Sequence, residues 1–81
     1  TKAAIYLEGL GGTENIADIT NCATRLRVTV KDPEKVEEAD YFKTVGGAHG
    51  LVKSGKNVQV IVGLSVPQVR EAAEQIIKHD A

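Results

Sequence analysis

Residues 16–30 read IADITNCATRLRVTV, and this stretch decides the fold. Apolar and polar residues alternate in it, most clearly in RLRVTV over residues 25–30. A period of two is typical of an antiparallel strand with one face on the core and the other toward water. A turn at Cys22 to Thr24 would pair residues 16–21 with residues 25–30. The stretch therefore predicts a β-hairpin.

Helices are predicted on both sides of this hairpin. The first spans residues 3–10 and stops at the glycines of residues 11–12, because glycine accepts the positive φ that ends a helix. The second opens with Asp32 as its N-cap and Pro33 as its first residue, and it ends at the glycines of residues 46–47.

The second half of the chain repeats the pattern. Residues 51–52 and 58–62 are predicted to form another hairpin around the turn at residues 54–57. A last helix begins near Ser65 and carries an apolar stripe made of Val66, Val69, Ala73, Ile76 and Ile77. The element order is thus α-β-β-α-β-β-α.

This order predicts an α+β fold with a four-stranded antiparallel sheet and helices packed on one face. The other face would be polar and would carry Arg25, Arg27 and Thr29. We expect residues 1–81 to form a single domain, because so short a chain supports only one layered core. The chain starts at Thr1 and holds no methionine, so we expect it to be a piece of a larger protein.

Composition excludes several classes of function. Ten basic residues stand against eleven acidic ones, and the formal charge of −1 argues against a nucleic-acid partner. Apolar runs are far shorter than the roughly 20 residues that cross a bilayer. A lone cysteine forms neither an internal disulfide nor a cysteine-rich zinc site. No signal-peptide pattern is present, which makes the cytosol the default location.

Chemistry concentrates around Cys22, which lies in a predicted turn ahead of Arg25 and Arg27. Guanidinium groups lower a thiol's pKa by stabilising the thiolate, and their forked donors match phosphate oxygens. Backbone N–H groups of a turn add further donors to an anion. The residues thus indicate a thiol that handles anions, such as a nucleophile that accepts and releases a phosphoryl group. An inert cysteine beside a solvated arginine face is the alternative.

Other cysteine chemistries fit less well. A disulfide oxidoreductase usually carries C-x-x-C, and a cysteine hydrolase needs a histidine base. We expect His79 to be solvated near the C-terminus and His49 to be a surface loop residue. The arginines follow Cys22 at C-x-x-R and C-x4-R spacing, not at the C-x5-R spacing of a tyrosine-phosphatase loop. No cluster of metal ligands is evident.

The motif CATRLR at residues 22–27, followed by VTVKD, strongly resembles the enzyme IIB domain of bacterial sugar phosphotransferase systems, in the glucose/sucrose-type permease superfamily. The segment GGTENI at residues 11–16 resembles the family's lead-in to its phosphorylated cysteine. GLV at residues 50–52 and VQVIVG at residues 58–63 resemble its second hairpin. The resemblance covers nearly the whole chain.

The resemblance implies a four-stranded antiparallel sheet covered on one face by helices, and an activity as a protein-phosphohistidine–sugar phosphotransferase. Cys22 would take a phosphoryl group from a phosphohistidine of enzyme IIA and pass it to a sugar hydroxyl held by the membrane domain, enzyme IIC. Arg25, Arg27 and Thr24 would stabilise that group. No metal or other cofactor is implied. The site of action would be the cytoplasmic face of the bacterial membrane, as part of a permease.

Residues next to Cys22 distinguish this chain from some members of the family. Some family members carry an acidic residue where this chain has Thr20, which we interpret as a plain strand residue. Asn21 and Ala23 look closest to members that handle glucose, maltose or related glucosides. The alternatives are a regulatory module that senses phosphorylation with the same fold, and a redox-sensing thiol. Because Cys22 and both arginines are retained, the active phosphoryl carrier is favoured.

Overall fold

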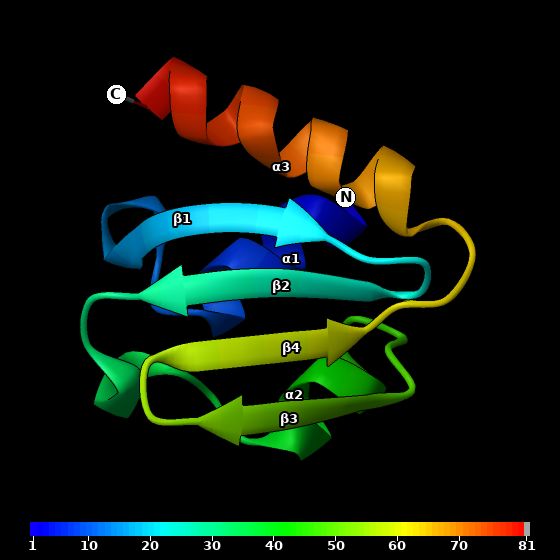
Figure 1. The fold of residues 1–81 in the computed structure, drawn as a ribbon, viewed down its shortest axis with the longest axis horizontal. Helices are drawn as coiled ribbons and strands as arrows, with labels where there is room; N and C mark the ends of the chain where they lie inside the picture. Colours follow the sequence, from blue (N-terminus) through cyan, green and yellow to red (C-terminus); the bar gives the residue numbers. More distant parts are fainter. Residues whose placement is uncertain (81) are drawn as a thin grey trace.

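In the computed structural model, which describes residues 1–80, the strands come in two consecutive pairs, each preceded by a helix. The elements are α1 (Lys2–Gly9), β1 (Ile16–Asn21), β2 (Arg25–Val30), α2 (Ala39–Thr44), β3 (Gly50–Ser54), β4 (Asn57–Ile61) and α3 (Val66–Asp80). Two short 3₁₀ helices, η1 (Thr13–Asn15) and η2 (Pro33–Lys35), precede β1 and follow β2. The order of the main elements is the predicted one (Figure 1).

The four strands form one antiparallel sheet in the order β1-β2-β4-β3. The first hairpin has the predicted bounds, and β2 then pairs with β4 at the centre of the sheet. β3 is longer than predicted, whereas β4 begins and ends one residue earlier. The second hairpin turns at residues 55–56, where Gly55 has a φ of +58°.

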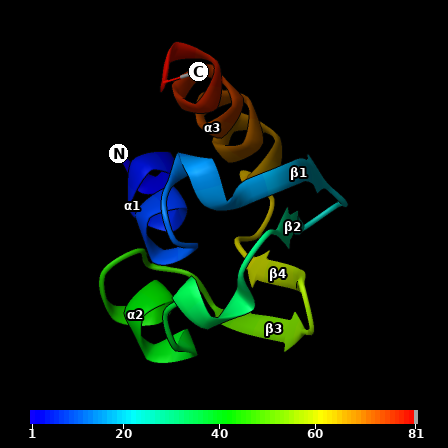
Figure 2. The same cartoon turned by 90° about the vertical axis from the view of Figure 1, so that its left-hand side faces the viewer.

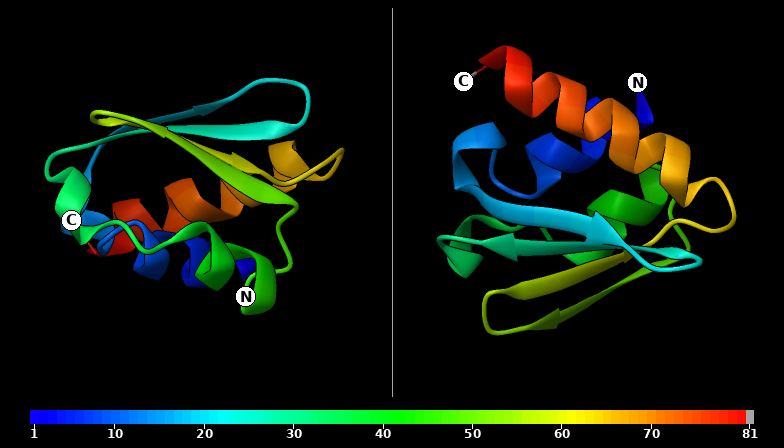
Figure 3. Two further views of the ribbon diagram at one scale, coloured as in Figure 1. Left: turned by 90° about the horizontal axis from the view of Figure 1, so that it is seen from below. Right: turned by 45° about the horizontal axis from the view of Figure 1, so that its top comes forward.

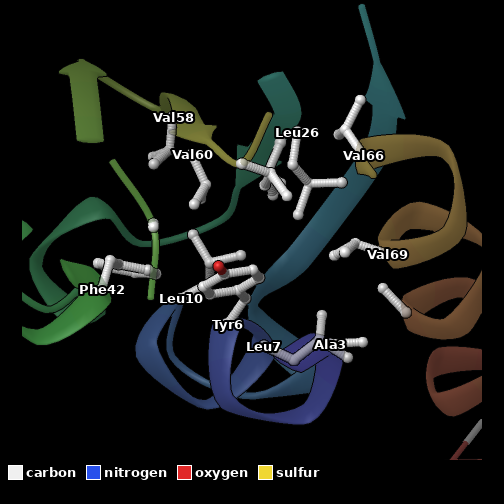
Figure 4. Close-up of a cluster of buried hydrophobic side chains, with 14 of the residues drawn as sticks. Ala3, Tyr6, Leu7, Leu10, Leu26, Phe42, Val58, Val60, Val66 and Val69 are labelled. Atoms are coloured by element: carbon white, nitrogen blue, oxygen red, sulfur yellow. The ribbon is translucent and has the colours of Figure 1, made fainter. Parts of the chain in front are cut away.

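All helices lie on one face of the sheet, as Figures 2 and 3 show. The apolar side chains of the two central strands meet the helices in a single core (Figure 4). The sheet contributes Leu26, Val28, Val30, Val58 and Val60, and the helices contribute chiefly Tyr6, Leu7, Phe42, Val66, Val69 and Ala73. The predicted fold class is therefore confirmed. No helix within residues 1–80 is long and apolar enough to cross a membrane.

The first helix begins and ends one residue earlier than predicted, with Leu10 as its C-cap before the glycines. Its N-terminus is capped by Thr1, whose hydroxyl accepts a hydrogen bond from the Ala4 N–H at 3.2 Å. After Leu10 the chain turns through Gly11 and Gly12, which have φ values of +103° and +92°. The Gly12 N–H returns to the Leu7 carbonyl at 2.9 Å, which satisfies a carbonyl at the helix end.

The helix predicted from Asp32 to the glycines of residues 46–47 is wrong as one element. Asp32 does cap a helix, since its side chain accepts from the Glu34 N–H at 3.0 Å, but that helix is only η2. The chain is then extended at Val36, with φ −82° and ψ 128°. The Glu37 N–H bonds to the Gly9 carbonyl at 2.7 Å. This bond to the end of α1 takes a donor that a continuous helix would use, and α2 starts afresh at Ala39.

Asn15 is the only polar residue among residues 1–80 that belongs to the buried class, at 3% exposure. Its Nδ2 donates to the carbonyls of Leu10 at 2.7 Å and Asp32 at 3.0 Å. Its Oδ1 accepts from the Asp32 N–H at 2.9 Å. One amide thus ties the end of α1 to the segment that follows β2, and so fixes the helix layer to the sheet.

Candidate functional site

Cys22 lies in the turn between β1 and β2, at the right-hand end of the sheet in Figure 1. Its N–H donates to the Arg25 carbonyl at 3.0 Å, which closes the turn. The Asn21 side-chain Nδ2 donates to the Cys22 carbonyl at 2.9 Å. The cysteine backbone is therefore held on both sides, while its side chain is half-buried.

The link between β4 and α3 supports this turn from the neighbouring strand. The N–H groups of Val62 and Gly63 both donate to the Thr24 carbonyl, at 3.0 and 2.8 Å. Gly63 has a φ of +108°, a conformation that residues with a Cβ rarely adopt. The Cys22 turn and this link therefore form one connected surface at the end of the sheet.

The surroundings of the Cys22 sulfur favour the thiolate. The pKa of the thiol is lowered, first by a hydrogen bond from the Thr24 backbone N–H and next by one from the Arg25 N–H. Partial desolvation opposes this, while the hydrogen bond and charge of the Arg27 side chain lower the pKa further. The sulfur also lies 3.7 Å from the Arg25 carbonyl, to which the thiol form donates. The turn thus stabilises the thiolate form of the sulfur.

Both arginines of β2 project from the open face of the sheet, as predicted. Arg27 is exposed and pairs across the ladder with Thr20 on β1 and with Gln59 on β4. Arg25 is half-buried, and its Nη1 donates to the Gln59 Oε1 at 3.0 Å. A groove of about 360 Å³ lies along this face, with Thr20, Arg27 and Gln59 in its lining.

Neither Arg25 nor Arg27 pairs with a carboxylate within the part of the chain that the structure describes. The ion pair found there joins Arg70 to Glu74 on α3, at 3.0 Å. The Arg27 side chain lies beside the thiolate-favouring cysteine, and the Arg25 guanidinium lies on the same open face at Gln59. Guanidinium groups without a carboxylate partner can bind an anion with several oxygens, such as a phosphoryl group.

A family model described as "phosphotransferase system, EIIB" matches residues 4–37, which include the Cys22 turn and all of β2. A protein named N-acetylglucosamine-specific EIIB component of the phosphotransferase system, from Streptomyces coelicolor, is 40% identical to the chain. The match covers 95% of the chain and 97% of that protein. The chain belongs to the enzyme IIB family.

Other relatives support the assignment to the enzyme IIB family. The maltose-specific EIICB component of Bacillus subtilis is 59% identical over 93% of the chain, and the chain spans 14% of that protein. The alpha-glucoside-specific EIICB component of Klebsiella pneumoniae is 52% identical over 95% of the chain, which again spans 14% of the relative. A crystal structure of one domain of a phosphotransferase IIabc component from Clostridium difficile superposes with a TM-score of 0.70 at 34% identity, covering 91% of the chain and 77% of that domain. The resemblance inferred from the motif is therefore confirmed.

The structure brings four predicted residues of this enzyme IIB domain together: Cys22, Thr24, Arg25 and Arg27. Thr24 takes part through its backbone, with the N–H facing the sulfur and the carbonyl receiving the β4–α3 link. Thr20 is a strand residue opposite Arg27, as interpreted from the sequence.

Both histidines are exposed. His49 lies just before β3, and its backbone N–H donates to the Ile61 carbonyl at 2.8 Å. His79 lies near the end of α3. Within residues 1–80 no group of three or more histidine, cysteine, aspartate or glutamate side chains could hold a metal ion.

Gln59 is the one site residue that the sequence reasoning missed. The alternation in VQV over residues 58–60 places Gln59 on the open face, opposite the core side of the strand. That pattern gives its face but not its partner, because contact with Arg25 depends on how β4 registers against β2.

Proposed function

We propose that the chain is the phosphoryl-carrier domain of a sugar permease, and that Cys22 carries the phosphoryl group. One observation carries this proposal: in an enzyme IIB domain, the Cys22 sulfur lies against the N–H groups of Thr24 and Arg25 and beside the Arg27 side chain. These groups favour an anionic sulfur, and donors of this kind also suit the oxygens of a phosphoryl group.

In the first step, the Cys22 thiolate attacks the phosphorus of a phosphohistidine on enzyme IIA. A sulfur–phosphorus bond forms, the phosphorus–nitrogen bond breaks, and the imidazole departs with the bonding pair and takes up a proton. The lowered pKa of Cys22 raises the share of the chain that carries the thiolate. The guanidinium groups of Arg25 and Arg27 offset the charge spread over the transferring oxygens.

In the second step, a sugar hydroxyl attacks the same phosphorus. An oxygen–phosphorus bond forms, the sulfur–phosphorus bond breaks, and the hydroxyl proton passes to a base at the sugar site. Cys22 leaves as a thiolate, which the same N–H groups stabilise. A group that stabilises the thiolate therefore assists both steps, because Cys22 is the nucleophile in the first and the leaving group in the second.

Partners follow from this cycle. We expect the donor to dock around Cys22, where Leu64 is 86% exposed in the link that Thr24 holds. Relatives named EIICB components are far longer than this chain, so we propose that residues 1–81 are one domain of a larger permease. Its enzyme IIC part would hold the sugar, a maltose or related glucoside, and the domain would act at the cytoplasmic face of the membrane.

The test is sugar phosphorylation by the full-length permease, supplied with phosphoenolpyruvate, the upstream relay proteins and enzyme IIA. We expect the wild type to form sugar phosphate and the Cys22→Ser variant to form none. Thr29→Ser, a conservative change on the same face, serves as the control that keeps activity. Sugar phosphate formed by Cys22→Ser at the wild-type rate contradicts the proposal. A chain that is phosphorylated but never passes the group to sugar indicates the regulatory alternative.

A further inference from the structure

The Gln59 side chain touches the candidate site without belonging to the motif around Cys22. Gln59 lies at the centre of β4, directly opposite Arg27 on β2. Its Oε1 accepts a hydrogen bond from Nη1 of Arg25, which lies two residues nearer the Cys22 turn. Gln59 therefore contacts Arg25 and lies across the ladder from Arg27, on the same open face.

The chemistry of the pair fixes the orientation of the Gln59 amide. A guanidinium group only donates hydrogen bonds, so the amide atom that faces Arg25 must be the oxygen. Arg25 is half-buried, and the bond ties the tip of its long side chain to a strand in the middle of the sheet. A side chain fixed in this way has lost much of its rotamer freedom before a ligand arrives.

A neutral partner keeps the charge of Arg25 available. No carboxylate of residues 1–80 pairs with Arg25, and the atom that holds it is an amide oxygen. A glutamate at position 59 would hold the guanidinium equally well, yet it would offset the positive charge and repel phosphoryl oxygens. Glutamine combines a fixed geometry with an undiminished charge.

We propose that Gln59 is a positioning residue, which aims the Arg25 guanidinium at the phosphoryl group carried by Cys22. The inference rests on the proposed function of Cys22. Gln59 acts through Arg25, so its contribution should depend on the forked guanidinium being present. A residue that only supported the sheet would show no such dependence.

Two substitutions separate position from charge. Gln59→Met keeps the size of the side chain and removes the acceptor, whereas Gln59→Glu keeps the acceptor and adds a negative charge. Gln75→Glu is the matched control, because it adds the same charge on the exposed surface of α3. We expect sugar phosphorylation by the permease to fall about tenfold in Gln59→Glu and severalfold in Gln59→Met, and to be unchanged in Gln75→Glu.

A second readout follows the phosphoryl group itself. Phosphorus-31 chemical shifts of the phosphorylated chain, recorded against pH, give the apparent pKa of the phosphocysteine. We expect this pKa to rise in Gln59→Glu, because a neutralised Arg25 no longer favours the dianion. Melting curves of each variant, measured in parallel, show whether the fold is retained.

The decisive comparison is the double variant. In an Arg25→Lys background, Gln59→Met should have no further effect on the transfer rate. An unchanged rate in Gln59→Met, or the same severalfold loss with and without Arg25, overturns the positioning role. A wild-type chain that forms no phosphocysteine overturns the proposed function instead, so the two failures are told apart.

Discussion

At the scale of single residues, the lowered thiol pKa of Cys22 comes first from backbone N–H groups and second from Arg27. The largest influence that lowers its thiol pKa is the N–H of Thr24, which the turn aims at the sulfur. The Arg27 side chain contributes a further hydrogen bond and a charge. A local turn therefore makes the largest contribution to the lowered thiol pKa, and an exposed side chain adds to it.

Replacement of Arg27 tests whether the backbone N–H groups lower the pKa of Cys22 more than the Arg27 side chain does. Arg27→Gln should raise the pKa of Cys22, yet leave it below the ordinary thiol value because the Thr24 and Arg25 N–H groups remain. The measurement is the rate of Cys22 alkylation by iodoacetamide as a function of pH, where the midpoint reports the pKa. An unchanged midpoint, or one at the value of a free thiol, would contradict the ranking.

The lowered pKa of Cys22 also makes the stability of the fold depend on pH. The folded state favours the thiolate, so this group stabilises the fold above the ordinary thiol pKa. That contribution is lost as the pH falls through the lowered pKa of the folded state.

Arg25 should not tolerate lysine. The guanidinium is a planar fork that reaches Gln59 and can still present donors to a phosphoryl group, whereas an ammonium is a single point of charge. Arg25→Lys should therefore reduce phosphoryl transfer to sugar about tenfold or more, although the net charge is kept. Sugar-phosphate formation by the variant permease is the measurement, with Lys53→Arg on the exposed part of β3 as control. Sugar-phosphate formation at the wild-type rate in Arg25→Lys would show that the Arg25 guanidinium takes no part in phosphoryl transfer.

The sequence predicts part of this residue-scale picture. Cys22, Arg25 and Arg27 could be found because they are close in the chain and the arginines alternate with core residues. Donors from the backbone of this turn were expected, but the leading part of the Thr24 N–H was not visible, because it depends on the conformation of the turn. Gln59 was missed because it meets Arg25 only through the pairing of β2 with β4, which no local pattern specifies.

At the scale of elements, the strands and the helices differ in how far local sequence determines them. The bounds of β1 and β2 were predicted correctly. In β2 the period of two holds throughout because one face is buried, whereas in β1 a register shift between Ile16 and Asp18 interrupts it. The helix expected after Asp32 was wrong, although its cap and proline are present. The bond from the Glu37 N–H to the Gly9 carbonyl interrupts it, and this contact joins segments far apart in sequence.

Asn15 offers a test of how the elements are joined. Asn15→Ala removes one buried and two part-buried hydrogen bonds, to Leu10 and Asp32. The Leu10 carbonyl and the Asp32 N–H lose the partner that Asn15 gives them, while the Asp32 carbonyl keeps its bond from the Lys35 N–H. The free energy of unfolding should fall by about 3 kcal/mol. Urea denaturation followed by circular dichroism measures it, with exposed Asn57→Ala as a control expected to stay within about 0.5 kcal/mol of wild type. Equal stabilities of the two variants would show that the Asn15 bonds do not hold these elements together.

At the scale of the whole molecule, the two faces of the sheet divide structure from chemistry. The helices bury one face in a single core (Figures 2 and 4). The other face presents Arg25, Arg27 and Gln59. The Cys22 turn lies at the end of the sheet, so a partner can reach it without disturbing the core. This separation suits a carrier that must meet a donor and an acceptor in turn.

A single core predicts a single unfolding transition for the chain. Tyr6 is fully buried between helices and sheet, so near-ultraviolet circular dichroism of the tyrosines reports the packing of both layers. Its urea midpoint should coincide with that of the far-ultraviolet signal from secondary structure. Separate midpoints would mean that residues 1–81 do not behave as one domain.

The central claim is that Cys22 carries the phosphoryl group, and the most direct measurement is phosphorus-31 NMR with intact-mass analysis of the chain. Wild type and Cys22→Ser are exposed side by side to phosphoenolpyruvate, the upstream relay proteins and enzyme IIA. We predict that the wild type gains one phosphoryl group with the chemical shift of a sulfur–phosphorus bond, and that Cys22→Ser gains none. An unmodified wild type beside a demonstrably phosphorylated enzyme IIA, or a phosphoryl group on another atom, would contradict the account.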